Sequence, residues 1–339
     1  MIWAHLARLG IALITLSIIG CASRAPRTSL PEWRAPHQRA HPLVGTIYET
    51  ATGAELSAEA LLQQLRGIQA DEPLGLLLGE LHDHPDHHQL QAWLIRALSP
   101  AEIGFEMLDE RQEAALAGLL EQAPTRWGET LQWTARGWPD FEIYRPIFEA
   151  AAARGAKLFA AHPTPAALFA VAKEGLSAVP DATEIGLGEP LSAELDAALN
   201  AELVKAHCGL LPPAMIPKMA LAQRVKDARL AEALLSAIER VNTQSSAAEG
   251  KALVAMIGGR GHFRNDRALP HVLRARRSAL KIRSIAFTPV EAEKVNIAEY
   301  TAPFDYIWFT PAHHGPEHDP CAELRARFQG HHQNGAARQ

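Results

Sequence analysis

Six short apolar runs, separated by longer segments with helical spacing, constrain the fold of this chain more than any other feature. The runs are LGLLLG (74–79), EIGFEM (102–107), KLFAA (157–161), ALVAMIG (252–258), KIRSIAF (281–287) and FDYIWF (304–309). They are strand-sized and mostly lack alternation, which is typical of parallel strands buried on both faces. Strands that alternate with helices predict an α/β domain with a mainly parallel sheet flanked by helices.

The segments between these runs carry helical patterns. An apolar stripe follows Pro85, as expected for a helix that starts there: Leu90, Trp93, Leu94 and Leu98. A long amphipathic helix is expected from about Pro213 to Val241. The stretch 163–243 is nearly all helical and predicts a helical insertion or lateral layer. An early hairpin, with its turn at Thr52-Gly53, is expected before the first helix.

Composition narrows the class of protein. The 339 residues hold 33 Lys and Arg against 38 Asp and Glu, 47% are hydrophobic and 21% are charged. Such a composition is that of a globular protein rather than a disordered one. The slightly acidic balance argues against a nucleic-acid partner. Three cysteines are too few for a disulfide-built scaffold or a multi-cysteine zinc module. We place the folded domain at residues 42–328.

The N-terminal residues predict export of the protein. Residues 1–20 combine one arginine with a short apolar run, which predicts a signal peptide. The residues before Cys21 resemble a bacterial lipobox, so Cys21 would be acylated, with palmitate among its chains. By the sorting rule for such lipoproteins, Ala22 then implies the outer membrane, where we expect the protein to face the periplasm. The alternative is an ordinary signal peptide with an incidental cysteine. Residues 21–41 predict a disordered tether and residues 329–339 a disordered tail.

Polar side chains follow each of the strong apolar runs. They include the cluster 80–88 after the first run, Glu106 after the second, His162 after the third, 259–264 after the fourth and His313-His314 after the last. In open parallel sheets, ligands bind in the crevice outside the carboxyl ends of the strands. We therefore expect these groups to converge on one edge of the sheet. The competing interpretation is that strand ends always meet polar loops.

Four of these residues form a set of two carboxylates and two imidazoles: Glu80, His82, Glu106 and His262. Such a set suits a divalent metal ion or acid–base work. Glu80 and His82 lie two residues apart, so on a strand they would point to the same face. The glycines on both sides of Arg260 would let the backbone approach a ligand and offer amides to an anion.

Further candidates are less specific. His84, Asp86, His87 and His88 are either helix caps or contacts to a metal or haem. Tyr144 lies with Arg145 in an aromatic segment that could line a flat hydrophobic cofactor, with the phenolate facing iron and the arginine a propionate; the alternative is a core tyrosine with a bonded hydroxyl. Cys208 and Cys321 remain after acylation and could pair in an oxidising periplasm.

The assembled pattern resembles the ChaN-like lipoproteins of the haem-binding uptake and Tiki superfamily. The resemblance rests on LGELHD (78–83) with His87-His88, GFEM (104–107), Trp138-Pro139, Tyr144-Arg145-Pro146, Ala222-Gln223, Lys226-Asp227 and Gly261-His262. It covers about residues 42–327. Lys226 departs from the arginine of the family pattern and loses bidentate pairing with a carboxylate.

The resemblance implies an outer-membrane lipoprotein that binds haem for haem or iron uptake, in contact with the uptake machinery. It also implies a homodimer that encloses two facing haems, with a tyrosine ligating each iron and a histidine assisting. Tyr144 is our choice for that tyrosine, with Arg145, His87, His88, Arg260 and His262 also at the haem site.

Two other functions stay open from the sequence. The superfamily also holds metal-dependent proteases and erythromycin esterases that share the Gly-Glu-x-His element. The alternative is therefore a metal-dependent hydrolase that uses Glu80, His82, Glu106 and His262 around a metal or an activated water. A non-catalytic envelope adaptor that keeps the pocket is a third interpretation. Whether the chain is an enzyme is thus undecided at this point.

Overall fold

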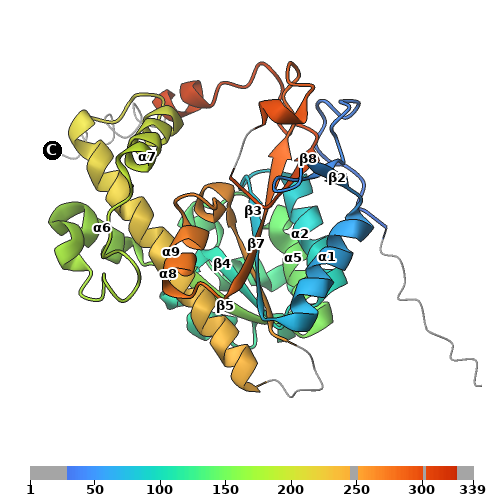
Figure 1. The fold of residues 1–339 in the computed structure, drawn as a ribbon, viewed down its shortest axis with the longest axis horizontal. Helices are drawn as coiled ribbons and strands as arrows, with labels where there is room; N and C mark the ends of the chain where they lie inside the picture. Colours follow the sequence, from blue (N-terminus) through green and yellow to red (C-terminus); the bar gives the residue numbers. More distant parts are fainter. Residues whose placement is uncertain (1–28, 245–250, 301–302, 327–339) are drawn as a thin grey trace, which may run out of the picture.

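The computed structural model describes residues 29–244, 251–300 and 303–326. Within them an eight-stranded sheet runs through the centre of the molecule in the order β2-β1-β8-β7-β3-β6-β4-β5 (Figure 1). The strands are β1 Ile47–Glu49, β2 Ala54–Leu56, β3 Leu74–Glu80, β4 Glu102–Asp109, β5 Lys157–His162, β6 Leu253–Gly259, β7 Lys281–Pro289 and β8 Tyr306–Thr310. The six apolar runs thus supply β3 to β8.

The direction of the strands confirms the predicted mainly parallel sheet. Strands β3 to β8 pair in parallel, whereas β1 is antiparallel to both β2 and β8. The β1–β2 pair is the expected hairpin, and its turn includes Gly53 with a φ of 74°. Glycine adopts this left-handed conformation without the steric cost that a Cβ would add.

Helices cover both faces of the sheet. The α-helices are α1 Ala58–Asp71, α2 Pro85–Leu98, α3 Glu113–Leu116, α4 Trp127–Thr130, α5 Phe141–Arg154, α6 Pro165–Glu174, α7 Ala193–Ala206, α8 Ile216–Gln244 and α9 Leu269–Arg276. The core beneath α1, α2 and α5 lies on one face of the sheet, and the core beneath α8 and α9 lies on the other. Figure 1 shows these two groups of helices on opposite sides of β3 and β7.

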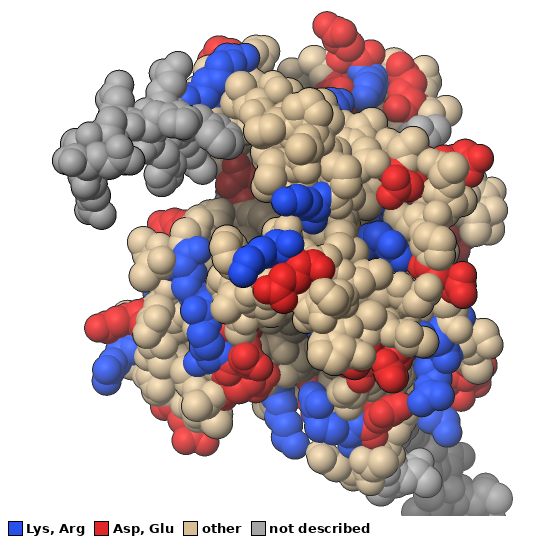
Figure 2. All heavy atoms as spheres, turned by 90° about the vertical axis from the view of Figure 1, so that its left-hand side faces the viewer, with Lys and Arg blue, Asp and Glu red and all other residues tan. Residues whose placement is uncertain are grey.

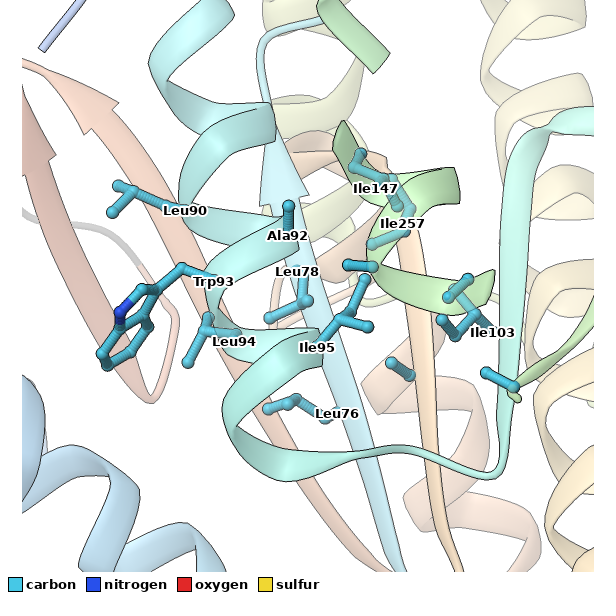
Figure 3. Packing of buried hydrophobic residues seen from close by; sticks show 14 of the residues in the cluster. Leu76, Leu78, Leu90, Ala92, Trp93, Leu94, Ile95, Ile103, Ile147 and Ile257 are labelled. Atoms are coloured by element: carbon cyan, nitrogen blue, oxygen red, sulfur yellow. The ribbon is translucent and has the colours of Figure 1, made fainter. Parts of the chain in front are cut away.

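Helix α2 illustrates how the sequence sets the local structure. Pro85 starts the helix, since its missing N–H would be unpaired there anyway. The helix ends at Ser99, which takes a left-handed conformation with a φ of 52°. The apolar stripe predicted from the sequence packs on β3: Figure 3 shows Leu94 and Ile95 of α2 close to Leu78 of that strand. This packing fixes the β3–α2 loop, where the first polar cluster lies.

The lateral helical layer expected at 163–243 is present. It consists of α6, α7 and α8, with contacts between α6 and α8 and between α7 and α8. Helix α8 starts at Ile216, three residues later than the predicted start at Pro213, because residues Pro213–Met215 form a separate 3-10 turn.

The segment before the domain differs from the expected tether. The side chain of Asp86 accepts hydrogen bonds from the N–H groups of Arg34 (2.6 Å) and Ala35 (3.1 Å), and His37 forms a β-bridge with Ala312. Residues 34–37 are therefore held on the domain, since a buried carboxylate needs such donors. The signal peptide at 1–20, Cys21, the start of the tether and the tail at 329–339 lie outside the described residues.

Three further features of the described residues complete the fold. Among the described residues, no helix combines the length and the apolarity that a membrane crossing requires. Cys208, just after α7, forms a disulfide with Cys321 near the end of the described chain. On the face drawn in Figure 2, Lys and Arg side chains alternate with Asp and Glu side chains rather than forming one continuous basic area.

Candidate functional site at the carboxyl edge of the sheet

Strands β3, β6 and β4 are adjacent, and each brings a polar residue to the same edge of the sheet. Glu80 is the last residue of β3 and Glu106 lies in the second half of β4. His262 lies in the 3-10 turn η7 (Arg260–Phe263) directly after β6. Because Glu80 pairs in register with Gly259 of β6, the ends of the two strands are level. The expected convergence therefore follows from parallel pairing.

Glu80 and His82 form the first ion pair of the site. His82 Nδ1 lies 2.7 Å from Glu80 Oε1, and 35% of the His82 side chain is exposed while that of Glu80 is fully buried. Burial opposes a charge on His82, but Glu80 and Glu106 outweigh it and raise its pKa to about 9. At neutral pH the site therefore presents an imidazolium to solvent. Its ring contacts Trp138 edge-on, with centroids 5.0 Å apart.

His262 lies between two buried carboxylates. Its Nε2 is 3.1 Å from Glu106 Oε1 and its Nδ1 is 2.6 Å from Asp227 Oδ1. Burial opposes the charge, but Glu106 and Asp227 together raise the pKa of His262 to about 10. Burial likewise opposes ionisation of Glu106, yet His262 holds its pKa well below the usual range. For Asp227, burial is the larger effect and raises its pKa.

Gly259 lies between the Glu80–His82 pair and the Glu106–His262–Asp227 group. Its N–H donates to Glu106 Oε2 at 2.6 Å. A Cβ at this position would lie 3.3 Å from His82 Nε2 and 3.4 Å from Glu106 Oε2, so a larger residue would press on both. The four side chains singled out from the sequence thus share one site, with the backbone of β6 between them.

Two further residues of this site were not among the candidates chosen from the sequence. Asp227 and Gln223 both come from α8, and the Gln223 amide nitrogen lies 3.0 Å from His262 Nδ1. They are four residues apart, so they share one face of the helix. That spacing was visible in the sequence, but nothing there indicated that this face meets the loop after β6.

Tyr144 does not face a ligand in this structure. Its side chain is fully buried, its hydroxyl donates to the carbonyl oxygen of His82 at 3.0 Å, and its ring lies against that of His88 with centroids 3.9 Å apart. Burial, and next the charge of Glu80, raise the pKa of the phenol. An iron-bound phenolate needs the reverse of both conditions, so Tyr144 takes the structural role that was the alternative.

Arg145 and the helix-entry histidines also lie away from the open edge. The Arg145 guanidinium is bound to Glu142 and to the carbonyl oxygen of Pro124. His87 and His88 are fully buried, and burial lowers the pKa of both. His87 Nδ1 accepts the N–H of Leu81 at 3.0 Å. These two imidazoles support the β3–α2 loop from inside, rather than reaching a ligand directly.

Two cations border the site without a carboxylate partner. Arg260 Nη1 donates to Thr288 Oγ1 at 3.3 Å, and within the described part of the chain no carboxylate lies within 4.0 Å of the guanidinium. Lys226 is half-buried and likewise forms no ion pair with a described residue. Its charge contributes, after burial, to lowering the pKa of His162 to about 4. This edge therefore offers positive charge to an anion.

A second histidine cluster follows β8. The His314 Nε2 lies 2.7 Å from Asp83 Oδ2, and its ring stacks on His318 with centroids 3.8 Å apart. The side chain of His314 is 41% exposed. Burial, and next the charge of His314, lower the pKa of the half-buried His313. Both rings are thus placed beside the β3–α2 loop.

The divalent metal of the hydrolase interpretation has no ready site here. In the ranges that the structure describes, no three His, Cys, Asp or Glu side chains are grouped so as to hold a metal ion. Instead, the acids and imidazoles of the edge are paired with one another.

A search of the solved structures found several that are similar to this chain. The structure titled as cofacial heme binding to ChaN of Campylobacter jejuni is 18% identical, with a TM-score of 0.54, and the match covers 77% of this chain and 95% of that one. The type III effector HopBA1 is 13% identical with a TM-score of 0.41, covering 74% and 93% of the two chains. A mutant erythromycin esterase in its open conformation is also 13% identical, with a TM-score of 0.40 and coverage of 72% and 77%.

Comparison with protein families identifies the chain at the level of sequence. A search of the curated proteins found no match. The model of the family described as haem-binding uptake, Tiki superfamily, ChaN matches residues 72–273, which is more than half of the chain and includes Glu80, Glu106, Asp227 and His262. The chain belongs to the ChaN family of the haem-binding uptake, Tiki superfamily.

Proposed function

We propose that this protein binds haem at the carboxyl edge of its sheet and serves haem or iron uptake from a lipid anchor. The observation that carries the proposal is the match to the haem-binding uptake family over residues 72–273, since that range contains the whole acid and imidazole site. The structural neighbour from Campylobacter jejuni, whose title reports cofacial heme binding, has the same fold.

The residues at the edge offer three things that haem binding requires. The first is a side chain that can bind the iron. A ligand must be neutral and reachable. His82 and His262 are protonated at neutral pH, and the imidazoles of the β3–α2 loop are buried. His314 is exposed, and burial lowers the pKa of its neighbour His313. We propose His314 as the iron ligand, which would exchange its contact with Asp83 for the iron.

The second requirement is charge. Haem carries two propionates, and carboxylates bind most firmly to cations whose own acid partners are absent. Arg260 and Lys226 meet this condition among the described residues, and His82 adds an exposed imidazolium. The third requirement is an aromatic surface, which Trp138 supplies beside His82. When bound, haem would supply an iron that can bind an imidazole, while the chain would bind, orient and shield it.

The finer parts of the function follow from the sequence and are proposals too. Acylation of Cys21 would anchor the protein in the outer membrane, facing the periplasm, and a homodimer and contact with the uptake machinery follow from the family resemblance. The Cys208–Cys321 disulfide supports an oxidising compartment, since disulfides persist there and are rare in reducing ones.

A haemin titration tests the binding proposal. The mature chain, purified oxidised, is mixed with ferric haemin and its Soret band is followed. We expect a saturable shift of the Soret band with one haem per chain. The His314→Ala variant should bind haem more weakly, and the double variant with Arg260→Gln more weakly still. Tyr144→Phe, which removes only a buried hydroxyl, serves as the matched control. A titration without saturation would overturn the proposal.

A second candidate function is hydrolysis of an ester or amide bond without a metal. One observation favours it: an exposed imidazolium, His82, is held by the buried Glu80 beside the coupled Glu106–His262–Asp227 group. Such a pair can donate a proton to a leaving group and accept one from water. A screen with activated esters and casein, repeated with His82→Ala and with Glu80→Gln, decides it. Turnover that neither substitution changes would exclude this site as its source.

A further inference from the structure

Residues 311–321, which we call the strap, run from the end of β8 to the helical layer. The strap begins on the β3–α2 side of the molecule: its first carbonyl, that of Pro311, lies 2.9 Å from His84 Nε2. Ala312 exchanges two backbone hydrogen bonds with His37. One end of the strap is therefore fixed to the domain by hydrogen bonds.

The middle of the strap borders the site. His314 of the strap is paired with Asp83, the residue next to His82. Burial opposes ionisation of Asp83, but the hydrogen bond from His314 lowers its pKa. His318 continues the strap, stacked on His314. The strap thus contacts the β3–α2 loop at Asp83, one residue along the chain from His82.

The far end of the strap is joined to α7, the helix that contacts the segment around His262. Cys321 is bonded to Cys208, directly beyond the C-terminus of α7. On the same helix, Glu202 is bound to Arg267 and faces Gly261, the neighbour of His262. In Figure 1 the C-terminal segment crosses the top of the view from β8 to α7. The strap and α7 are therefore joined into a continuous frame, from the end of β8 to the segment after β6.

The disulfide is what closes this frame. Within the described residues, the hydrogen bonds and ion pairs that the strap forms from His318 onward stay within the C-terminal segment, such as that of His318 with Glu323 at 3.5 Å, whereas the disulfide joins the strap to α7. Exposed ion pairs of this kind hold a segment only weakly. Both cysteines are half-buried rather than enclosed, so a small reductant can reach the sulfurs.

We propose that the Cys208–Cys321 disulfide fixes the strap as the outer wall of the ligand site, and that its reduction opens the site and speeds ligand release. The inference rests on the proposed haem function for the nature of the ligand. A dithiol reductant supplies two electrons and two protons: the S–S bond breaks, two thiols form, and the reductant becomes a disulfide. Ligand retention would then depend on the redox state of the compartment.

Two measurements on the same samples test this. Hydrogen exchange followed by mass spectrometry reports the strap (311–321) and the rim (80–88 and 259–264), with and without dithiothreitol. Haem release is followed by transfer from the haem-loaded protein to an excess of a haem-scavenging apoprotein. Cys208→Ser/Cys321→Ser is the matched control, because it lacks the bond and should not respond to the reductant.

We expect reduction to raise exchange in the strap and to speed haem release about tenfold, which corresponds to ~1.4 kcal/mol, with the double serine variant open under both conditions. Unchanged strap exchange on reduction would overturn the inference, as would a faster strap with unchanged haem release. If the oxidised protein takes up no haem, the proposed function fails instead; exchange in the strap and the rim then decides alone whether the disulfide closes the frame.

Discussion

The charge on His262 should make the stability of the protein fall with pH in a defined window. Its pKa rises from 6.5 to about 10 on folding, because two carboxylates outweigh the cost of burial. The stabilisation is therefore fully present below pH 6.5 and is lost as the pH rises towards 10. A change of this size corresponds to ~5 kcal/mol in total. Since only 8% of the side chain is exposed, solvent screens this pair little.

Between pH 7 and 8.5 the folded state holds this proton and the unfolded state does not. Stability should then fall by ~1.4 kcal/mol per pH unit from this group alone, or ~2 kcal/mol over the interval. We expect His262→Gln, which cannot titrate, to lack this part of the slope. Its stability at pH 7 should itself be lower by about 3–5 kcal/mol, because Glu106 and Asp227 are left buried without the cation.

The assay is urea unfolding of the oxidised, haem-free protein at pH 7.0 and 8.5, for the wild type and the variant. His162→Gln is the control: its pKa is lowered to about 4, so the imidazole is neutral throughout this interval and its loss should leave the slope unchanged. His82, whose pKa is about 9, adds a slope of the same sign in all three proteins; the His262 charge lowers the pKa of His82, so its loss does not remove that slope. Equal slopes in the wild type and His262→Gln would refute the ion-pair account of this site.

Three further predictions concern packing, the N-terminal segment and the site. Gly104→Ala should destabilise the protein by about 1–3 kcal/mol, because the added Cβ would meet the ring of Phe159. Gly67→Ala, where the added Cβ has open space, should stabilise the protein by about 0.5–1 kcal/mol. Thermal unfolding of the two variants measures both effects. Asp86→Ala should speed tryptic cleavage within the first described residues, which it holds; mass spectrometry of the fragments detects this. Arg260→Gln should weaken haemin binding about tenfold, as measured by absorption, and undiminished affinity would remove it from the site.

Most of the fold could be predicted because it follows from local pattern. An unalternating apolar run of strand length, such as 74–79, has few options other than a buried parallel strand. The position of the site also followed, because parallel pairing places Glu80, Glu106 and His262 at one edge whatever the details of the loops.

The roles of single side chains could not be predicted in the same way. Tyr144 and Arg145 are neighbours on α5, so they point in different directions; one is buried under the β3–α2 loop and the other is bound at the surface. Only the packing of α5 against α2 decides which residue faces inwards. Asp227 was missed for a related reason: the sequence does not show which part of the fold packs against a given face of a helix.

The N-terminal segment shows a third limit. An Arg- and Pro-rich stretch without apolar periodicity is typical of a tether. Its order here comes from distant partners: the carboxylate of Asp86 accepts two of its backbone N–H groups, and His37 pairs with Ala312. Sequence pattern does not reveal a hydrogen-bond partner more than fifty residues away.

The central claim is that the ligand binds at the carboxyl edge of the sheet. Paramagnetic NMR tests it most directly, by comparing amide signals of the protein loaded with ferric haem and with the diamagnetic zinc protoporphyrin. We expect the iron to broaden the signals of residues 80–84, 259–262 and 312–315 and to spare those of residues 99–101 and 251–253 at the opposite edge. Broadening at that opposite edge, with the first set left sharp, would contradict the account.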